Sequence, residues 1–331
     1  MSLSPSGDRS PADSVVQFSR RFLDLKENIE GFVRGKEETV RLALVCLFAE
    51  GHLLIEDVPG VAKTSLARAI ARSVDGHVRR IQFTPDLLPT DIIGFNVFDP
   101  SALTFSFRRG PVFANIVLGD EINRASPKTQ SALLEVMAER QVTVEGAAMV
   151  LPRPFLCIAT QNPIEHQGTY PLPEAQLDRF AMRISVGYPS RQSEVEVVTG
   201  GLARRRPEEL RAVMDVAEMI TWMDVVRQVA FSLELRDYVV RLAAATRDHE
   251  KVRLGVSPRG TVALAVCAQA SAAAEGMPFV TADHIKALVK PVFAHRMLMT
   301  SQARAEEATA FEVLDHLVER VPVPRDRGTF D

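Results

Sequence analysis

Residues 57–64, D-V-P-G-V-A-K-T, combine a glycine, a lysine and a threonine between an apolar run and a helical pattern. A helix that starts here aims its free N–H groups and the positive end of its dipole at the loop, which favours an anion. Lys63 can then contact the β- and γ-phosphates of a nucleotide, and Thr64 can ligate Mg²⁺. We therefore predict a phosphate-binding loop. Its predicted nucleotide contacts are Pro59, Gly60, Val61, Ala62, Lys63, Thr64 and Ser65.

The loop departs from the usual phosphate-loop pattern, G-x-x-x-x-G-K-[ST], at both glycines of that pattern. Asp57 stands at the first and Ala62 at the second, while Gly60 still allows unusual backbone angles. If the site of Ala62 needs a positive φ, its methyl group costs roughly 1–2 kcal/mol. For this segment alone, an ordinary strand–turn–helix corner with a chance Lys-Thr pair stays an alternative. The effect of Ala62 on turnover stays open.

A second segment, residues 116–121, is an apolar run that ends in two carboxylates, as is typical of a Walker B motif. Asp120 would hold Mg²⁺ together with Thr64, and Glu121 would polarise the water that attacks a γ-phosphate. Asn162 follows a third apolar run, where its amide could orient the same water or bind the γ-phosphate. An Asn-Pro pair after a strand is also ordinary turn chemistry. The spacing of the first two segments argues against coincidence.

Three short apolar runs, at residues 53–55, 115–119 and 155–159, indicate strands buried on both faces, with helical patterns between them. This alternation predicts a doubly wound α/β fold with a parallel sheet. Loops beyond the carboxyl ends of the strands would bring the chemical segments together. After about residue 189 helical patterns replace the strands. We expect a flexible tail at residues 1–14, an α/β core at 15–189 and an all-helical domain at 190–331.

Longer stretches of the sequence extend these motifs. Residues 119–144 read GDEINRASPKTQSALLEVMAERQVTV, and A-T-Q-N-P at 159–163 and L-P-E-A-Q-L-D-R-F at 172–180 follow. Together they closely resemble the MoxR family of AAA+ ATPases, which is related to the motor subunits of magnesium chelatase. The resemblance runs from about Ile29 to the helical end of the chain. It implies a P-loop NTPase core followed by a helical lid domain, an ATPase activity, and ATP, ADP and Mg²⁺ as ligands.

Proteins of that family form rings, usually hexamers, that hold ATP between neighbouring subunits and remodel protein clients. By the resemblance, Arg179 matches the arginine finger that reaches the γ-phosphate in the adjacent subunit. Arg259, in Ser-Pro-Arg-Gly at 257–260, matches the sensor-2 arginine at the start of a lid helix. The catalytic candidates are thus Glu121, Asn162, Arg179 and Arg259. Without the resemblance, a surface salt bridge would be the preferred interpretation of Arg179.

The same resemblance implies two insertions in the core. Residues 91–109 would interrupt the second core helix, and residues 139–152 would form a hairpin before the third strand. Such insertions commonly line the pore of the ring, so Phe95, Phe98 and Phe107 are candidate client contacts. Packing within each insertion is an equal alternative. The family also implies a partner with a von Willebrand A domain, which we expect on a separate chain.

The composition limits the remaining possibilities. Hydrophobic residues make up 46% and charged residues 24% of the 331 residues, as in ordinary folded proteins. The net charge of -3 argues against nucleic acid as a partner. With no apolar stretch long enough to cross a bilayer and no secretion signal, we expect a cytoplasmic protein without membrane insertion. Two rivals stay open: a non-hydrolysing scaffold gated by nucleotide, and a nucleic-acid motor.

Overall fold

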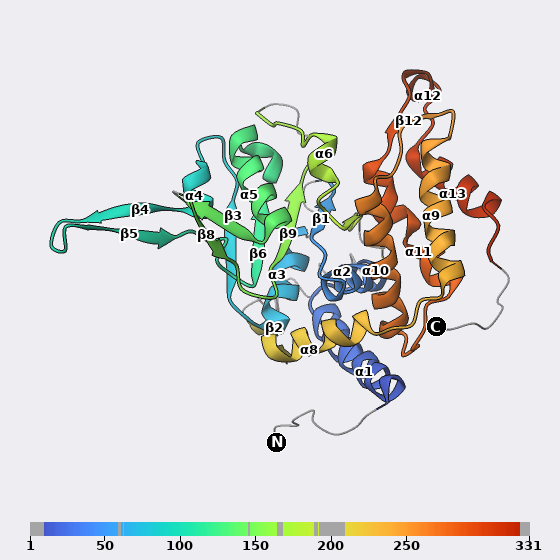
Figure 1. Cartoon of the computed structure of the whole chain (residues 1–331), viewed down its shortest axis with the longest axis horizontal. Helices are drawn as coiled ribbons and strands as arrows, with labels where there is room; N and C mark the ends of the chain where they lie inside the picture. Colours follow the sequence, from blue (N-terminus) through green and yellow to red (C-terminus); the bar gives the residue numbers. More distant parts are fainter. Residues whose placement is uncertain are drawn as a thin grey trace.

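The computed structural model describes residues 10–58, 61, 63–144, 146–163, 168–188, 191 and 209–324. Its centre is a five-stranded sheet in the order β10-β1-β9-β6-β3, in which every neighbouring pair is parallel (Figure 1). These strands are β1 (Leu53–Glu56), β3 (Val78–Gln82), β6 (Ile116–Asp120), β9 (Leu156–Gln161) and β10 (Met182–Ile184). The parallel sheet predicted from the apolar runs is therefore present.

Successive side chains of the central strands enter two different apolar layers. In β1, Leu53 and Ile55 belong to one buried cluster and Leu54 to the other, and each of the three is fully buried. Side chains alternate across a strand, so burial on both faces requires apolar residues at every position. The continuous run Leu-Leu-Ile is the expected result.

Helices cover both faces of the sheet. The first layer contains α2 (Glu37–Phe48) and α3 (Lys63–Ser73), and the second contains α5 (Pro127–Glu139). The Ser126 hydroxyl accepts the Thr129 amide at 3.4 Å and caps α5, whose first residue is a proline with no amide hydrogen to satisfy. The sequence places this helix start correctly.

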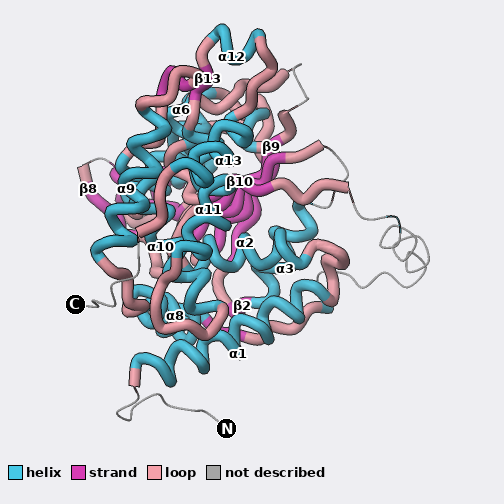
Figure 2. The backbone as a smooth tube through the Cα atoms, turned by 90° about the vertical axis from the view of Figure 1, so that its right-hand side faces the viewer, coloured by secondary structure: helices cyan, strands magenta, loops and turns pink. Residues whose placement is uncertain are grey.

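The C-terminal part is a helical lid that packs along the β10 edge of the sheet and faces the viewer in Figure 2. Three short strand segments lie among its described residues, so the lid is not purely helical. Elements of two or three residues leave no periodic pattern in a sequence, which is why the prediction lacked them. The helices are α8 (Val216–Arg227), α9 (Leu233–Arg247), α10 (Pro258–Ala274), α11 (Ala282–Phe293), α12 (Ser301–Ala305) and α13 (Ala310–Arg320). The strands are β12 (Val252–Leu254), which pairs with β13 (Leu298–Met299), and β11 (Met214–Asp215), which pairs with β2 (Val74–Asp75) of the core.

The N-terminal helix α1 (Pro11–Glu30) includes residues 11–14, which were expected to belong to a flexible tail over residues 1–14. The Ser10 side chain accepts the Asp13 amide and Pro11 occupies the first turn, a combination that stabilises a helix start. Phe18 of α1 contacts Phe48 of α2, with ring centroids 4.9 Å apart, and Trp222 of α8 at 6.0 Å. The helix thus packs against both the core and the lid. Residues 1–9 and the boundary expected at 189–190 lie outside the described residues.

Two antiparallel hairpins interrupt the core. In Figure 1 the hairpin of β4 (Gly94–Asp99) and β5 (Thr104–Arg109) projects well beyond the sheet after the short helix α4 (Pro89–Ile93). The second joins β7 (Gln141–Val144) to β8 (Ala147–Val150). Both expected insertions are therefore hairpins. In the part of the chain that the structure describes, no helix is long and apolar enough to span a membrane.

Candidate functional site

The candidate phosphate loop lies where the sequence places it, between β1 and α3. Lys63 is the first residue of α3, and its Nζ donates to the carbonyl oxygens of Val58 (3.2 Å), Gln161 (3.1 Å) and Asp57. The ammonium group is therefore held between the ends of β1 and β9. Pro59, Gly60 and Ala62 lie outside the described residues, Val61 is buried, and Ser65 lies in the first turn of α3.

The Thr64 hydroxyl and the Asp120 carboxylate meet beside this loop. Thr64 Oγ1 lies 3.2 Å from Asp120 Oδ1, and Arg80 Nε lies 2.6 Å from Asp120 Oδ2. Only 4% of the Asp120 side chain is exposed. A hydroxyl beside a carboxylate fits the hard oxygen ligands that Mg²⁺ prefers. Among the described residues, no group of three or more His, Cys, Asp or Glu side chains is arranged to hold a metal ion.

Glu121 leaves the strand through a left-handed backbone conformation, with φ 57° and ψ 52°. For a residue other than glycine this conformation costs on the order of 1–3 kcal/mol, and such residues cluster at functional sites. The Glu121 amide donates to Thr160 Oγ1 at 3.0 Å, which fixes the turn to the end of β9. The Glu121 carboxylate accepts a hydrogen bond from Gln82 Nε2 and forms an ion pair with Arg124 Nε, each at 3.2 Å. Glu121 is thus held by three neighbouring segments.

Asn162 lies directly after β9 and is buried. Its carbonyl oxygen accepts Asn123 Nδ2 at 3.0 Å, and Asn123 belongs to the short 3-10 helix η1 (Ile122–Arg124) that follows Glu121. The segments after β6 and β9 are therefore fastened to each other. The fold brings Lys63, Thr64, Asp120, Glu121 and Asn162 to the carboxyl ends of β1, β6 and β9, as predicted.

The two candidate arginines have other surroundings. Arg179 Nη1 donates to the backbone oxygen of Leu134 in α5, and the Arg179 side chain is half-buried. Arg259 is exposed in the first turn of α10, whose N-cap is Ser257. The hydrogen bonds described above for the phosphate loop and the two carboxylates do not include either arginine. Their roles at a nucleotide stay predictions.

Several residues that support this site are not among those predicted from the sequence. Arg80 and Gln82 of β3 reach Asp120 and Glu121, and Thr160 fixes the Glu121 turn. In β3 the exposed residues Arg80 and Gln82 flank the buried Ile81, a pattern typical of an edge strand. The pattern does not show which residues the two polar side chains contact. β3 pairs with β6 at five positions, and no motif in β3 predicts this pairing, which is a property of the assembled sheet.

Asp57, which stands at the first glycine position of the loop pattern, joins the phosphate loop to the segment after β10. Asp57 Oδ2 accepts the Ser185 hydroxyl at 2.6 Å and the Gly187 amide at 2.5 Å, and Oδ1 accepts the Val58 amide at 2.7 Å. Burial on its own would raise the pKa of Asp57, but these hydrogen bonds outweigh it and lower that pKa. The residue that replaces the first loop glycine is thus a structural anchor.

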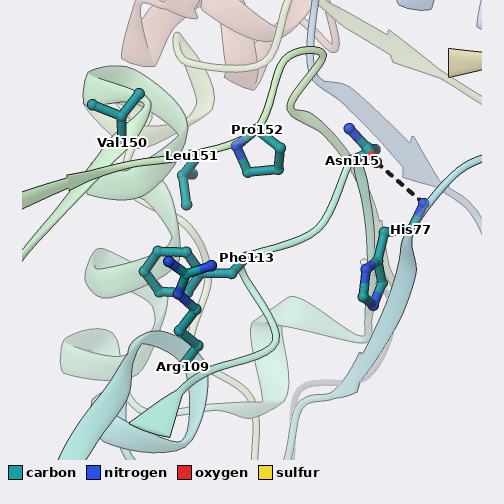
Figure 3. Close-up of a pocket in the computed structure, with 7 residues that line it drawn as sticks. All are labelled: His77, Arg109, Phe113, Asn115, Val150, Leu151 and Pro152. Carbon is teal, nitrogen blue, oxygen red and sulfur yellow. Dashed lines mark hydrogen bonds between the residues drawn. The ribbon is translucent and has the colours of Figure 1, made fainter. Parts of the chain in front are cut away.

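A separate pocket lies at the opposite end of the sheet. His77 precedes β3 and Asn115 precedes β6, so the pocket is at the amino ends of these parallel strands. Figure 3 shows the Arg109 guanidinium over the Phe113 ring, with a Cζ-to-centroid distance of 5.3 Å. The lining residues are His77, Arg109, Phe113, Asn115, Val150, Leu151 and Pro152. This pocket is distinct from the candidate nucleotide site, which lies beyond the carboxyl ends.

Both the core and the helical lid match known protein families. Residues 52–182 match the ATPase family associated with various cellular activities (AAA), and residues 244–317 match the AAA lid domain. The chain is 44% identical to the uncharacterized protein YeaC of Bacillus subtilis over 91% of this chain and 94% of that protein. It is 39% identical to chaperone MoxR1 of Mycobacterium tuberculosis over 97% of this chain and 86% of MoxR1.

A solved structure has the same fold. The crystal structure of a candidate ATPase from Cytophaga hutchinsonii superposes with a TM-score of 0.87 at 32% sequence identity. The similarity covers 95% of this chain and 98% of that one. Core and lid therefore follow one another in both chains, as the resemblance implied.

Proposed function

Since the chain belongs to the MoxR family of AAA ATPases, we propose that it hydrolyses ATP with Mg²⁺ and uses the energy to remodel a partner protein. Membership of this family implies that the chain binds a nucleotide. ATP hydrolysis, the Mg²⁺ ion, the ring of subunits and the client protein are proposals. The relative named chaperone MoxR1 supports a chaperone-like role.

The observation that carries the proposal is the side-by-side position of Thr64 and Asp120 next to Glu121. In this arrangement Thr64 and Asp120 would hold Mg²⁺, which supplies charge neutralisation at the phosphates when bound. Lys63 would bind the β- and γ-phosphates. Glu121 would accept a hydrogen bond from the attacking water and take up its proton as a general base. Asn162 would orient that water. The left-handed backbone conformation of Glu121 supports this role, because residues with this kind of strain cluster at functional sites.

We further propose that ATP lies between neighbouring subunits of a ring, usually a hexamer in this family. Arg179 of one subunit would then stabilise the charge that develops on the γ-phosphate held by the next subunit. Arg259 would contact nucleotide from the lid of the subunit that binds it. Closure of the lid on the core would transmit the nucleotide state to the client.

The projecting β4–β5 hairpin is the proposed client contact. Phe95 and Phe98 are 44% and 46% exposed, and Phe98 packs against Phe105, whose exposure is 72%. Exposed aromatic clusters of this kind commonly mark protein contacts. Phe107 differs, because it is half-buried and its ring packs on Phe113 at 6.0 Å. A separate protein with a von Willebrand A domain stays the partner that the family implies.

Steady-state ATP hydrolysis over a series of protein concentrations tests the proposal. Turnover should rise with concentration, because the active site needs two subunits, and Glu121→Gln should lower kcat by about 100-fold or more. Arg179→Ala should lower kcat by about 1,000-fold. Tight ATP binding with no phosphate release would instead support the nucleotide-gated scaffold. Stimulation by DNA that falls steeply with salt would support the nucleic-acid motor.

A further inference from the structure

The segment that carries Arg179 is held by the lid as well as by the core. Arg296 Nε lies 2.8 Å from Asp178 Oδ1, and the Ser257 hydroxyl donates to the same carboxylate at 3.0 and 2.9 Å. Asp178 directly precedes Arg179 and follows the short helix α6 (Glu174–Leu177). Two lid residues from different elements therefore converge on the carboxylate next to the arginine.

Arg296 is almost fully buried, with 2% of its side chain exposed. Besides Asp178 Oδ1, its guanidinium donates to the backbone oxygens of Phe180 (2.6 Å), Asp178 (3.2 Å) and Ala181 (3.2 Å). These carbonyl groups belong to a single stretch of four residues. A buried guanidinium needs such partners, because an unpaired buried charge is strongly destabilising. The stretch cannot shift relative to Arg296 without loss of several charge-assisted hydrogen bonds.

Among the described residues, Arg179 itself is bound to the core and not to the lid. Its guanidinium donates to the Leu134 carbonyl of α5, and the next side chain, Phe180, is fully buried in the apolar layer that contains Leu134. Within three consecutive residues, Asp178 is thus held by the lid, while Arg179 and the Phe180 side chain are held by the core. A movement between lid and core would therefore pull on this segment from both sides.

Ser257 connects the same point to the start of α10. Its Oγ accepts the Gly260 amide at 3.2 Å and so caps the helix, while its hydrogen is donated to Asp178. Arg259, the candidate sensor-2 arginine, lies two residues after Ser257. A displacement of the beginning of α10 therefore moves the hydroxyl that anchors Asp178.

We infer that Asp178, Ser257 and Arg296 form a link by which the lid of one subunit sets the position of its own Arg179 toward the neighbouring subunit. The inference rests on the proposed interfacial ATPase. The three residues are positioning residues, because they contact the Arg179 segment and not the nucleotide. Lid movement in one subunit then controls hydrolysis in the next.

Mixed rings test the link. A finger-donating subunit carries Glu121→Gln, so its own site is inactive, and an accepting subunit carries Arg179→Ala, so its site depends on the donor. Each alone should be inactive, and a mixture should regain turnover. Adding Asp178→Asn to the donor should then lower the regained turnover at least about tenfold, since misplacement of a catalytic group by about 1 Å costs up to about 100-fold. The same change on the acceptor should cost less than about threefold.

The outcomes separate the link from the proposed function. If the mixture regains no turnover although both variants bind ATP, the interfacial finger is wrong and the link falls with it. If the mixture is active and Asp178→Asn is silent, or is equally harmful on either subunit, the link alone is overturned. Ser257→Ala on the donor is the milder second variant, because it removes one hydroxyl and leaves Arg296 paired with Asp178.

Hydrogen exchange gives a readout that does not depend on turnover. In the single subunit, Ser257→Ala should speed exchange of the amides of residues 178–181, because their lid anchor is weakened. The matched control is Asp315→Asn, which breaks a lid ion pair with Lys290 at 2.6 Å that lies on exposed side chains of α13 and α11. Unchanged exchange at residues 178–181 in Ser257→Ala would contradict the link.

Discussion

The two ends of the parallel sheet each bury a carboxylate beside arginine, yet the surroundings of the two carboxylates differ. At the carboxyl end, Asp120 shares its oxygens between Arg80 and the Thr64 hydroxyl. At the amino end, Glu50 precedes β1 and has a side chain only 3% exposed. Its ion-pair partners are Arg140 at 2.9 Å, Arg153 at 2.7 Å and Arg227 at 3.0 Å.

The difference supports the separate roles that we propose for the two carboxylates. Three arginines neutralise Glu50 completely and join the ends of α2, α5 and α8 to the approach of β9, so Glu50 contributes to stability. Asp120 keeps one oxygen beside a hydroxyl, which is an arrangement open to a metal ion. Under the proposed function, two carboxylates with similar burial and arginine partners would serve different purposes, and substitutions at each end should separate activity from stability.

Of the substitutions at these two ends of the sheet, Asp120→Asn is expected to have the largest effect. Loss of the carboxylate removes the charge that would hold Mg²⁺, so kcat/KM for ATP should fall by about 100-fold, or about 2.7 kcal/mol. The free energy of unfolding should change by less than about 1 kcal/mol, because Arg80 is nearly half-exposed and can be solvated. Steady-state kinetics over a Mg²⁺ series and urea unfolding measure the two quantities. A large loss of stability with intact turnover would reverse the assignment of the two ends.

Glu50→Gln is expected to act on stability instead. The free energy of unfolding should fall by about 2 kcal/mol, less than for a fully buried ion pair because the arginines are 42–56% exposed. Turnover per folded molecule should stay within about twofold of the wild type. Urea unfolding monitored by circular dichroism gives the first value. The matched control is Asp224→Asn, which removes an exposed partner of Arg153 and should cost under about 1 kcal/mol.

The smallest expected effect is a change with pH in the difference in the free energy of unfolding between the wild type and Glu50→Gln. Burial alone would raise the pKa of Glu50, but hydrogen bonds from Arg153 and Arg140 and the charge of Arg227 outweigh it and lower the pKa. A carboxylate with a lowered pKa contributes stability above its unfolded pKa of about 4.3, and the contribution is lost as pH falls through the folded value. The stability gap between wild type and Glu50→Gln should therefore narrow from about pH 6 to about pH 3. A gap that widens toward acid would contradict the ion-pair account.

Much of the fold could be predicted from short patterns. The family, the parallel sheet, the helical lid and the hairpin within residues 139–152 are confirmed, and the insertion expected at residues 91–109 contains a second hairpin. The helix α1 extends into the tail expected at residues 1–14, because the Ser10 cap and Pro11 start the helix before its first buried residue, Val15. Contacts of Arg80 and Gln82 could not be predicted, since no local rule states which strand lies beside β3.

The sequence by itself determined the chemistry at the ends of the strands: Lys63, Thr64, Asp120 and Glu121 follow apolar runs, and parallel strands bring such residues to one edge. Only the tertiary structure decided which distant side chains support them. Arg296 lies 118 residues from Asp178, and Arg153 lies 103 residues from Glu50. Periodicity and capping act over a few residues, whereas the partner of a buried charge is fixed by how the core and the lid pack together.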